Sequence, residues 1–339
     1  MFIKSVAIQI AFQLIVGLLF VSSNNAQAYS GPLIDGHLHL SYFSDPEVIR
    51  EKFKNQTVTK AVIFPREFKA GNDIGITEKQ ARKFAEKNVD IGYVLLGLQL
   101  EMLHNVNIPV RFWTNPSGAW LDWLKYAEEE LISGRRKGMG ELIIRHYDYH
   151  GKGFGENDYP IKSKVFESLI ELSNRTRRPL IIHAEGEDHV VRDVLDMLAR
   201  YPAAKIVWAH GCGRSNPQKV YEWLSSHSNL YCDLGNMTDT GRYGSFWPRA
   251  GEWTFQFESG GVIKADWLRV IEKFPDRLYI GSDVNEAQGW NKAWETRIKR
   301  FRVLLDQVSP SAQEWLAYKT VETLYGWCAC VPVCVGHYH

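Results

Sequence analysis

The chain has 339 residues, 45% of them hydrophobic, which suffices for one large domain or two ordinary ones with a sizeable core. Lysine and arginine together number 40, against 39 for aspartate and glutamate. Such a balance provides no bulk charge that would attract nucleic acid or hold the protein on an acidic surface. The composition therefore disfavours a nucleic-acid partner.

The N-terminal segment predicts a secretion signal. Lys4 precedes an apolar stretch over 6–21, which is followed by polar residues and the small-residue site Ala26-Gln27-Ala28. The stretch is on the short side for a membrane span of about 20 residues. A buried first helix or an uncleaved anchor is the alternative. We expect residues 1–28 to be a signal peptide, with no stable membrane anchor after its removal and a secreted or periplasmic location.

From Leu33 onward, eight short apolar runs predict β-strands, and the amphipathic stretches between them predict helices. The strands are expected at 33–40, 59–64, 91–98, 138–145, 179–185, 205–211, 229–234 and 277–284. The intervening helices are expected at 46–55, 77–88, 119–132, 162–174, 188–200, 217–226 and 265–273. Two further helices are predicted at 291–307 and 311–324.

This alternation predicts an α/β fold, a single-domain (β/α)8 TIM barrel over 29–327 with extra C-terminal helices. The alternative is a doubly wound parallel sheet, which would favour a glycine-rich phosphate loop after the first strand. The fragment GKGFG at 151–155 lacks the G-x-G-x-x-G spacing of such a loop. No internal repeat, linker or change of composition indicates a second domain.

The connection over 235–261, after the seventh strand, is unusually long and rich in glycine and aromatic residues. In a barrel this loop would lie over the face where active sites form. It therefore predicts a lid that shapes the substrate pocket, with Trp247 as a substrate-binding residue. A packed irregular excursion over the barrel rim is the alternative.

The five cysteines do not form an even disulfide framework. Cys212 and Cys232 lie in the body of the chain, whereas Cys328, Cys330 and Cys334 lie in a short tail over 328–339. An odd number leaves at least one thiol unpaired within a monomer. The tail also holds histidines, but its spacing matches no standard zinc pattern. We therefore expect a disordered or disulfide-linked tail.

Metal-binding side chains stand near the carboxyl ends of four predicted strands. His37 and His39, two residues apart in the first strand, point to the same face. His183, His210 and Asp283 stand near the ends of strands five, six and eight. Because the carboxyl ends of parallel barrel strands converge on one mouth, these five side chains are predicted to meet around a metal ion.

Strand four contributes Glu141, a carboxylate that could bridge two metal ions. The alternative is a structural acid paired with Arg145, which shares its face, or with another inward cation, since a buried glutamate needs a partner. Arg66 and Arg145 follow strands two and four and could hold a carboxylate or phosphate of the substrate. A rim salt bridge is the alternative for each arginine.

Other polar residues have weaker claims or none. The residues on predicted mouth loops are His146, His150, Glu185 and Arg242. The histidines expected to be surface residues are His104, His189 and His227.

The segments IDGHLHL, GMGEL, PLIIHAE, IVWAHG and YIGSDV resemble those of the amidohydrolase superfamily, specifically its amidohydrolase-related branch of metal-dependent hydrolases. The resemblance implies a (β/α)8 barrel in which the metal ligands are His37, His39, His183, His210 and Asp283. Some members carry a bridging carbamylated lysine on strand four. This chain has Glu141 there, which is similar to the deoxyribonuclease-like relatives that bridge with glutamate. One or two ions remain compatible with the pattern.

A zinc or similar divalent ion lowers the pKa of bound water from near 16 to about 7. We therefore expect a metal-dependent hydrolase acting on a small-molecule ester, lactone, amide or phosphoester, with Asp283 as general base. His210 would be a second-site ligand or a catalytic hydrogen-bond donor to the oxyanion. One alternative is a single-metal decarboxylase of an aromatic or unsaturated acid. Another is a non-catalytic metal-binding barrel, and an oligomer is compatible with each.

Overall fold

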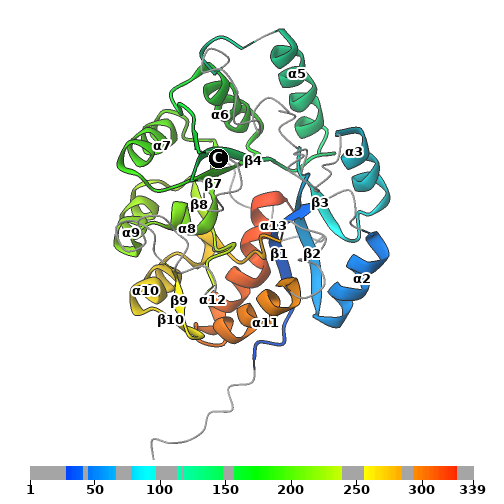
Figure 1. The fold of residues 1–339 in the computed structure, drawn as a ribbon, viewed down its shortest axis with the longest axis vertical. Helices are drawn as coiled ribbons and strands as arrows, with labels where there is room; N and C mark the ends of the chain where they lie inside the picture. The colour runs from blue at the N-terminus through cyan, green and yellow to red at the C-terminus, as the bar shows by residue number, and fades with distance from the viewer. Residues whose placement is uncertain are drawn as a thin grey trace, which may run out of the picture.

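The computed structural model describes residues 28–40, 45–65, 78–96, 113–116, 118–147, 156–238, 256–284 and 293–326. In these residues, parallel strands form a central barrel that is surrounded by a ring of helices (Figure 1). The predicted signal peptide and the C-terminal tail lie outside the described residues, apart from Ala28. The predicted (β/α)8 barrel is confirmed.

The first part of the barrel is a sheet of three parallel strands, β1, β2 and β3 in that order. Their bounds are Leu33–Leu40, Val58–Pro65 and Gly92–Val94. The second part is a sheet ordered β11-β8-β7-β6-β4, with the short antiparallel strand β5 (Asn157–Asp158) added at its edge. Its parallel strands are β4 (Met139–His146), β6 (Pro179–Ala184), β7 (Lys205–Trp208), β8 (Leu230–Asp233) and β11 (Leu278–Tyr279).

Backbone hydrogen bonds close the two sheets into one barrel. On one side, Leu96 N donates to Gly138 O at 3.0 Å and Gly140 N donates to Leu96 O at 3.0 Å. On the other side, the chain after β11 runs along β1, with Asp283 N donating to His37 O at 2.7 Å. Within the described residues, the eight barrel strands are therefore β1, β2, β3, β4, β6, β7, β8 and β11.

The outer helices occupy the stretches predicted from amphipathic patterns. They are α2 (Pro46–Asn55), α3 (Glu78–Lys87), α5 (Gly118–Ile132), α6 (Lys164–Thr176), α7 (Asp188–Arg200), α9 (Pro217–Ser226), α10 (Ala265–Lys273) and α11 (Ala293–Leu305). Several begin where a polar side chain satisfies a free backbone amide: Asp45 accepts from Glu47 N, and Ser163 accepts from Phe166 N. No described helix is long and apolar enough to cross a membrane.

The predicted helix over 311–324 is interrupted. It consists of α12 (Pro310–Glu314), a π-helical turn at Trp315–Lys319 and α13 (Thr320–Tyr325). Buried side chains of α13 pack against apolar residues of the barrel strands, among them Ile181 and Tyr279. Ile181 lies two residues before His183 on β6, so both side chains share one face of the strand. This packing contributes an apolar floor beneath the predicted metal ligands.

Three predicted boundaries were wrong. The third strand ends at Val94, after which Leu96 pairs with Met139 only through an isolated bridge. The eighth contains only Leu278–Tyr279, because the following residues pair with β1 only through an isolated bridge between Leu38 and Val284. The predicted strand over 205–211 ends at Trp208, where a short turn labelled α8 (Ala209–Arg214) begins. The long connection after β8 contributes a hairpin of β9 (Glu258–Ser259) and β10 (Val262–Ile263), but the predicted lid residue Trp247 lies outside the described residues.

Candidate metal centre

His37 and His39 lie side by side at the mouth end of β1. The Nε2 atoms of the two rings are 3.2 Å apart, and His37 is completely buried. On its other side, His37 Nδ1 lies 3.1 Å from Asp233 Oδ2. Because an ionised carboxylate only accepts hydrogen bonds, Nδ1 of His37 carries the proton and donates it to Asp233. When the ring is neutral, the lone pair of His37 Nε2 therefore faces the centre of the cluster.

His183 and His210 form a second pair, brought together from β6 and the turn after β7. His210 Nδ1 donates to the carbonyl oxygen of Gly235 at 2.8 Å. This bond leaves the lone pair of His210 Nε2 facing inward, 2.9 Å from His183 Nδ1. The orientation is that of a metal-binding histidine whose second nitrogen is fixed by a hydrogen bond.

Glu141 lies between the two histidine pairs. Its Oε2 is 3.6 Å from His37 Nε2 and 3.4 Å from His39 Nε2. Its Oε1 is 3.2 Å from His183 Nδ1 and 3.7 Å from His210 Nε2. The result is two groups of three ligands that share Glu141, and the donor atoms of each group lie within 4.8 Å of one another.

Asp283 adds a second carboxylate to the group of His37, His39 and Glu141. Its Oδ1 lies 3.3 Å from His39 Nε2 and 3.6 Å from His37 Nε2. The backbone around it is held by Arg297, whose Nη1 donates to Asp283 O at 2.9 Å. All six predicted metal ligands are thus brought to one cluster at the carboxyl ends of the strands, as the sequence predicts.

The electrostatics of the cluster favour positive charge at its centre. Burial alone would raise the pKa of Glu141, but His37 and hydrogen bonds with His183 and His39 hold that pKa well below its ordinary value. Burial opposes charge on His37 as well, but Asp233 and Glu141 outweigh it and raise the pKa of His37 well above normal. Burial likewise lowers the pKa of His183, but Glu141 and Glu185 outweigh it and raise this pKa to about 9.

These residues fit a divalent cation. Buried imidazole lone pairs that face one another and a carboxylate are unfavourable unless a proton or a cation lies between them. Four imidazole nitrogens with carboxylate oxygens are the donors that zinc and similar ions prefer. His37, His39, Glu141, His183, His210 and Asp283 would hold such an ion or ions.

An unusual backbone segment carries His210. The φ angles of His210, Gly211, Cys212, Gly213 and Arg214 are 59°, 61°, 56°, 72° and 57°, so α8 is a left-handed turn. Glycine adopts this region freely, but each other residue there costs about 1 to 2 kcal/mol. Neighbouring contacts must offset that cost, among them His210 N donating to Asp233 Oδ1 at 3.2 Å.

Two buried aspartates that support the cluster were missed from the sequence. Asp233 holds both His37 and His210 and also accepts from Gly235 N at 2.8 Å. Asp35 accepts from Ser282 N at 2.7 Å and from Trp294 Nε1 at 2.9 Å, which ties β1 to the chain after β11. The available signal was their position, because each lies within or at the end of an apolar strand.

The arginines predicted to bind substrate have different outcomes. Arg145 pairs with Glu156 at 2.5 Å and with Glu187 at 2.7 Å, and its guanidinium lies over the Tyr147 ring. These contacts match the rim ion pair that was its alternative, and its role in substrate binding stays a prediction. Arg66 lies outside the described residues.

Weaker candidates surround His183 or fall outside the described part. The His146 ring lies 4.9 Å from the His183 ring, and Glu185 Oε1 lies 3.5 Å from His183 Nε2. Burial, followed by the charge on His183, lowers the pKa of His146 to about 3. The candidates outside the described residues are His150 and Arg242, and His104, which was expected to be a surface residue, lies outside them as well.

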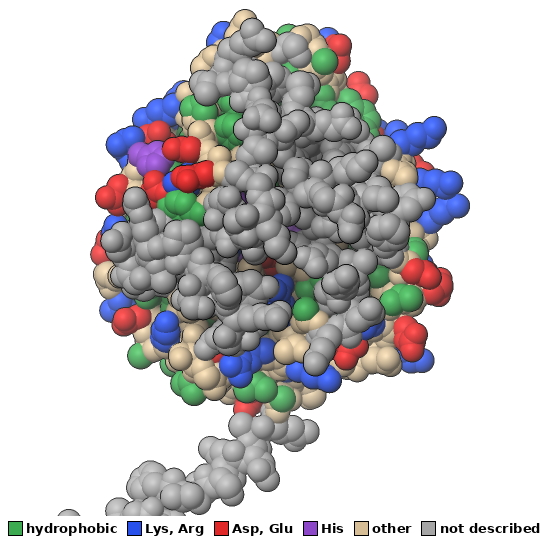
Figure 2. All heavy atoms as spheres, in the orientation of Figure 1, with side chains coloured by type: hydrophobic (Ala, Val, Ile, Leu, Met, Phe, Trp, Pro, Cys, Tyr) green, Lys and Arg blue, Asp and Glu red, His purple; other side chains and the backbone are tan. Residues whose placement is uncertain are grey.

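Charged side chains of both signs are interspersed around the rim of the face shown in Figure 2, among the described residues. This mixed distribution agrees with the nearly equal numbers of acidic and basic residues in the chain.

Comparison with known proteins supports the fold. No family model and no curated protein matches the chain. Among solved structures, a TatD homologue from Escherichia coli has 19% identity and a TM-score of 0.55, with 87% of this chain and 98% of that chain covered. A probable 2-pyrone-4,6-dicarboxylic acid hydrolase from Acinetobacter baumannii, solved with citric acid bound, has 14% identity and a TM-score of 0.53, with coverages of 87% and 99%.

A third solved structure is an amidohydrolase from Burkholderia multivorans with bound zinc. It has 13% identity and a TM-score of 0.51, with 87% of this chain and 99% of that chain covered. The structural neighbours of this chain are thus amidohydrolase barrel proteins and a TatD homologue, and at these identities what they share with it is the fold.

Proposed function

We propose that this protein is a metal-dependent hydrolase of the amidohydrolase type, in which the two ligand groups that share Glu141 would hold two divalent cations, zinc or similar ions. The observation that carries the proposal is that the two carboxylate oxygens of Glu141 face different histidine pairs. One oxygen faces His37 and His39, and the other faces His183 and His210. The zinc in the Burkholderia multivorans amidohydrolase and the hydrolase description of the Acinetobacter baumannii protein support it.

When bound, such an ion supplies an acidified water and polarises the substrate carbonyl or phosphoryl oxygen. The residues of the chain would do the rest. Asp283 Oδ1 lies at the mouth beside His39, and hydrogen bonding to His39 together with the charge of His37 outweighs burial and lowers the pKa of Asp283. A carboxylate ionised at neutral pH and placed beside the ligands can accept a proton from water, which makes Asp283 the proposed general base.

His210 is proposed to act as a neutral imidazole. Its burial, followed by the charges of Arg214 and His183, lowers its pKa to about 4. The carbonyl of Gly235 fixes the proton on Nδ1 and leaves the lone pair of Nε2 facing the centre, where it can bind a cation. In the two-ion arrangement His210 is therefore a metal ligand, and it would become a catalytic residue in a single-ion enzyme.

The substrate is proposed to be a small ester, lactone, amide or phosphoester. The test combines elemental analysis of the full-length protein with a panel of these compounds. We expect two ions per chain, hydrolysis that stops on chelation and returns on adding zinc, and loss of an ion and of turnover in Glu141→Gln. Glu51→Gln, on the exposed side of α2, is the control.

Other outcomes of the same test would replace the proposal. A single ion with release of carbon dioxide from an aromatic or unsaturated acid would indicate a decarboxylase. Bound ions without turnover of any compound would indicate a non-catalytic metal-binding barrel. Protein that takes up no divalent cation would overturn the metal centre itself.

A secreted or periplasmic location is also proposed, from the N-terminal signal pattern. A disulfide between Cys212 and Cys232 supports it, because disulfides persist mainly in oxidising compartments. N-terminal sequencing of the protein recovered from its native compartment should begin near Tyr29. A mature chain that retains Met1 and its apolar stretch would contradict this location.

A further inference from the structure

The left-handed turn α8 is tethered to the rest of the site at three points. His210 N donates to Asp233 Oδ1, Cys212 forms a disulfide with Cys232, and Arg214 Nη1 donates to Glu185 Oε1 at 2.6 Å. His210, Cys212 and Arg214 are the non-glycine residues of the turn, and each has a positive φ angle. Each residue that disfavours the left-handed conformation is thus fixed by a contact with another segment.

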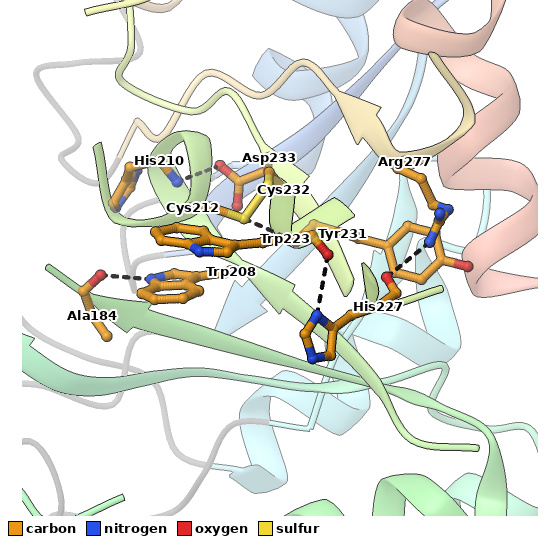
Figure 3. The surroundings of a disulfide bond; sticks show 10 residues. All are labelled: Ala184, Trp208, His210, Cys212, Trp223, His227, Tyr231, Cys232, Asp233 and Arg277. Carbon is orange, nitrogen blue, oxygen red and sulfur yellow. Dashed lines mark hydrogen bonds between the residues drawn. A yellow bond between two sulfur atoms is a disulfide. The ribbon is translucent and has the colours of Figure 1, made fainter. Parts of the chain in front are cut away.

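The disulfide joins the two segments that determine how His210 is held. Cys212 follows His210 by two residues, and Cys232 directly precedes Asp233, whose carboxylate accepts from His210 N (Figure 3). The same carboxylate also contacts His37 Nδ1. Both cysteines are completely buried. The covalent bond therefore fixes the turn to the end of β8, beside the aspartate that orients two ligands.

Ring stacking, a hydrogen bond and strand pairing hold the residues around the disulfide in place. Trp208 stacks on Trp223 with ring centroids 5.6 Å apart, and its Nε1 donates to Ala184 O at 2.6 Å (Figure 3). In the ladder between β7 and β8, Trp208 is the partner of Cys232. The chain leaves β7 at Trp208 and must reverse at once to bring Cys212 back to Cys232, so the bond determines the path of the intervening residues 209–211.

We propose that the disulfide between Cys212 and Cys232 is a positioning element for the metal centre, which holds His210 Nε2 toward Glu141 and His183. This inference rests on the proposed metal function and extends it to the control of one ligand group. In the oxidised chain both groups bind an ion. In the reduced chain the group of Glu141, His183 and His210 loses affinity, whereas the group of His37, His39 and Glu141 retains its ion.

The redox step is a simple thiol–disulfide exchange. An external dithiol transfers two electrons and two protons, the S–S bond breaks to give two thiols, and the dithiol becomes a cyclic disulfide. The reverse step requires an external disulfide as the oxidant. The Glu185–Arg214 pair and the hydrogen bond from Gly186 N to Gly213 O at 3.0 Å do not involve the S–S bond, so we expect the turn to loosen rather than unfold on reduction.

The experiment uses the full chain with Cys328→Ser, Cys330→Ser and Cys334→Ser in every arm, so that only the body cysteines react. Zinc and cobalt binding are measured by calorimetry and by the visible spectrum of cobalt in three states: oxidised, reduced with the reductant removed, and reoxidised. We expect about 10- to 100-fold weaker binding of one of two ions after reduction, as for loss of other groups that orient metal ligands, and recovery on reoxidation.

Variants separate the bond from simple packing. Cys212→Ala, Cys232→Ala and the double variant should weaken the same ion equally, because either single change already removes the whole bond; additive losses would indicate packing instead. The control is Leu172→Ala, in the buried face of α6. This change should lower thermal stability without changing the affinity for either ion. Circular dichroism checks the fold, and if the double variant does not fold, the reduced and reoxidised chains still decide.

The outcomes are distinct. Equal binding of both ions in the oxidised and reduced chains would overturn the proposal while leaving the metal function intact. Detection of Cys212 and Cys232 as free thiols in chain recovered under oxidising conditions would also overturn it. An oxidised chain that binds no ion would show instead that the proposed function has failed.

Discussion

At the scale of single residues, the candidate site depends on acids that orient the metal ligands without belonging to either ligand group. Asp233 is the clearest case, since one oxygen accepts from His37 Nδ1 and the other accepts from the amides of His210 and Gly235. It determines which nitrogen of His37 carries the proton. The ligands alone therefore do not define the site, because the tautomers of the histidine ligands are determined by the residues that contact them.

Asp233→Asn tests this role with almost no change in size. The amide has only one acceptor oxygen, and if that oxygen serves the amides of His210 and Gly235, the NH2 group faces His37 Nδ1. His37 would then carry its proton on Nε2, which blocks the donor atom. We expect zinc affinity to fall by about 10- to 100-fold, measured by competition with a chromophoric chelator.

The control for this change is Asp276→Asn, an exposed carboxylate in the short turn over Pro275–Arg277 that precedes β11. It should leave zinc affinity unchanged. Wild-type affinity in Asp233→Asn, with the fold intact by circular dichroism, would remove Asp233 from the support of the site.

At the scale of elements, the sequence pattern predicted those features that depend only on residues close together in the chain. The spacing of His37 and His39 and the apolar runs predicted the strands, since the two-residue period is a property of each strand by itself. The positions of His183, His210 and Asp283 followed from the parallel arrangement, because strand ends converge at one mouth. The convergence of the strand ends depends on strand order alone and requires no particular side-chain contact.

What the sequence did not reveal depends on contacts between distant segments. The left-handed turn at Ala209–Arg214 reads as a continuation of an apolar strand, because its conformation is imposed by Asp233, Cys232 and Glu185 from other elements. The disulfide itself was not predicted, since an odd number of cysteines allows many pairings. Trp247 and Arg66, both predicted to bind substrate, lie outside the described residues, and no contact tests them.

Gly213→Ala tests the turn as an element. Gly213 has a φ of +72°, and an added Cβ would lie 2.5 Å from Ala184 O and 2.8 Å from Gly186 N, both backbone atoms. Gly134 offers a matched control, because it has the same φ of +72° and its nearest neighbour is Lys137 Nζ at 3.4 Å. Gly134→Ala should cost about 1 to 2 kcal/mol for the left-handed conformation alone.

We expect Gly213→Ala to cost more than this control by about 1 to 3 kcal/mol, because backbone atoms must move to admit the methyl group. The midpoint of denaturant unfolding measures the difference. Equal midpoints for the two variants would mean that the turn adapts easily, which would also weaken the case that it fixes His210.

At the scale of the whole molecule, the residues of the candidate metal centre come from both sheets of the barrel. His37 and His39 belong to the sheet of β1, β2 and β3, whereas Glu141, His183 and His210 come from β4, β6 and the end of β7. The seam between β1 and the chain after β11 has few backbone hydrogen bonds, among them Gly36 N to Ile280 O at 3.0 Å and His39 N to Val284 O at 3.0 Å. A cation bound to both sides would therefore act as a cross-link over this seam.

Removal of the metal should accordingly weaken the seam more than the rest of the barrel. A ligand that binds only the folded state at 100 times its Kd stabilises it by about 2.7 kcal/mol, so chelation should lower the melting temperature by about 5 to 10 °C. Hydrogen exchange should quicken at the amides of Gly36, His39 and Asp283, while Ile206 and Val207, in the ladders of β7 with its neighbours, provide the internal reference. Exchange that quickens uniformly over all the strands would contradict a cross-link at the seam, because the ion would then stabilise the barrel only globally.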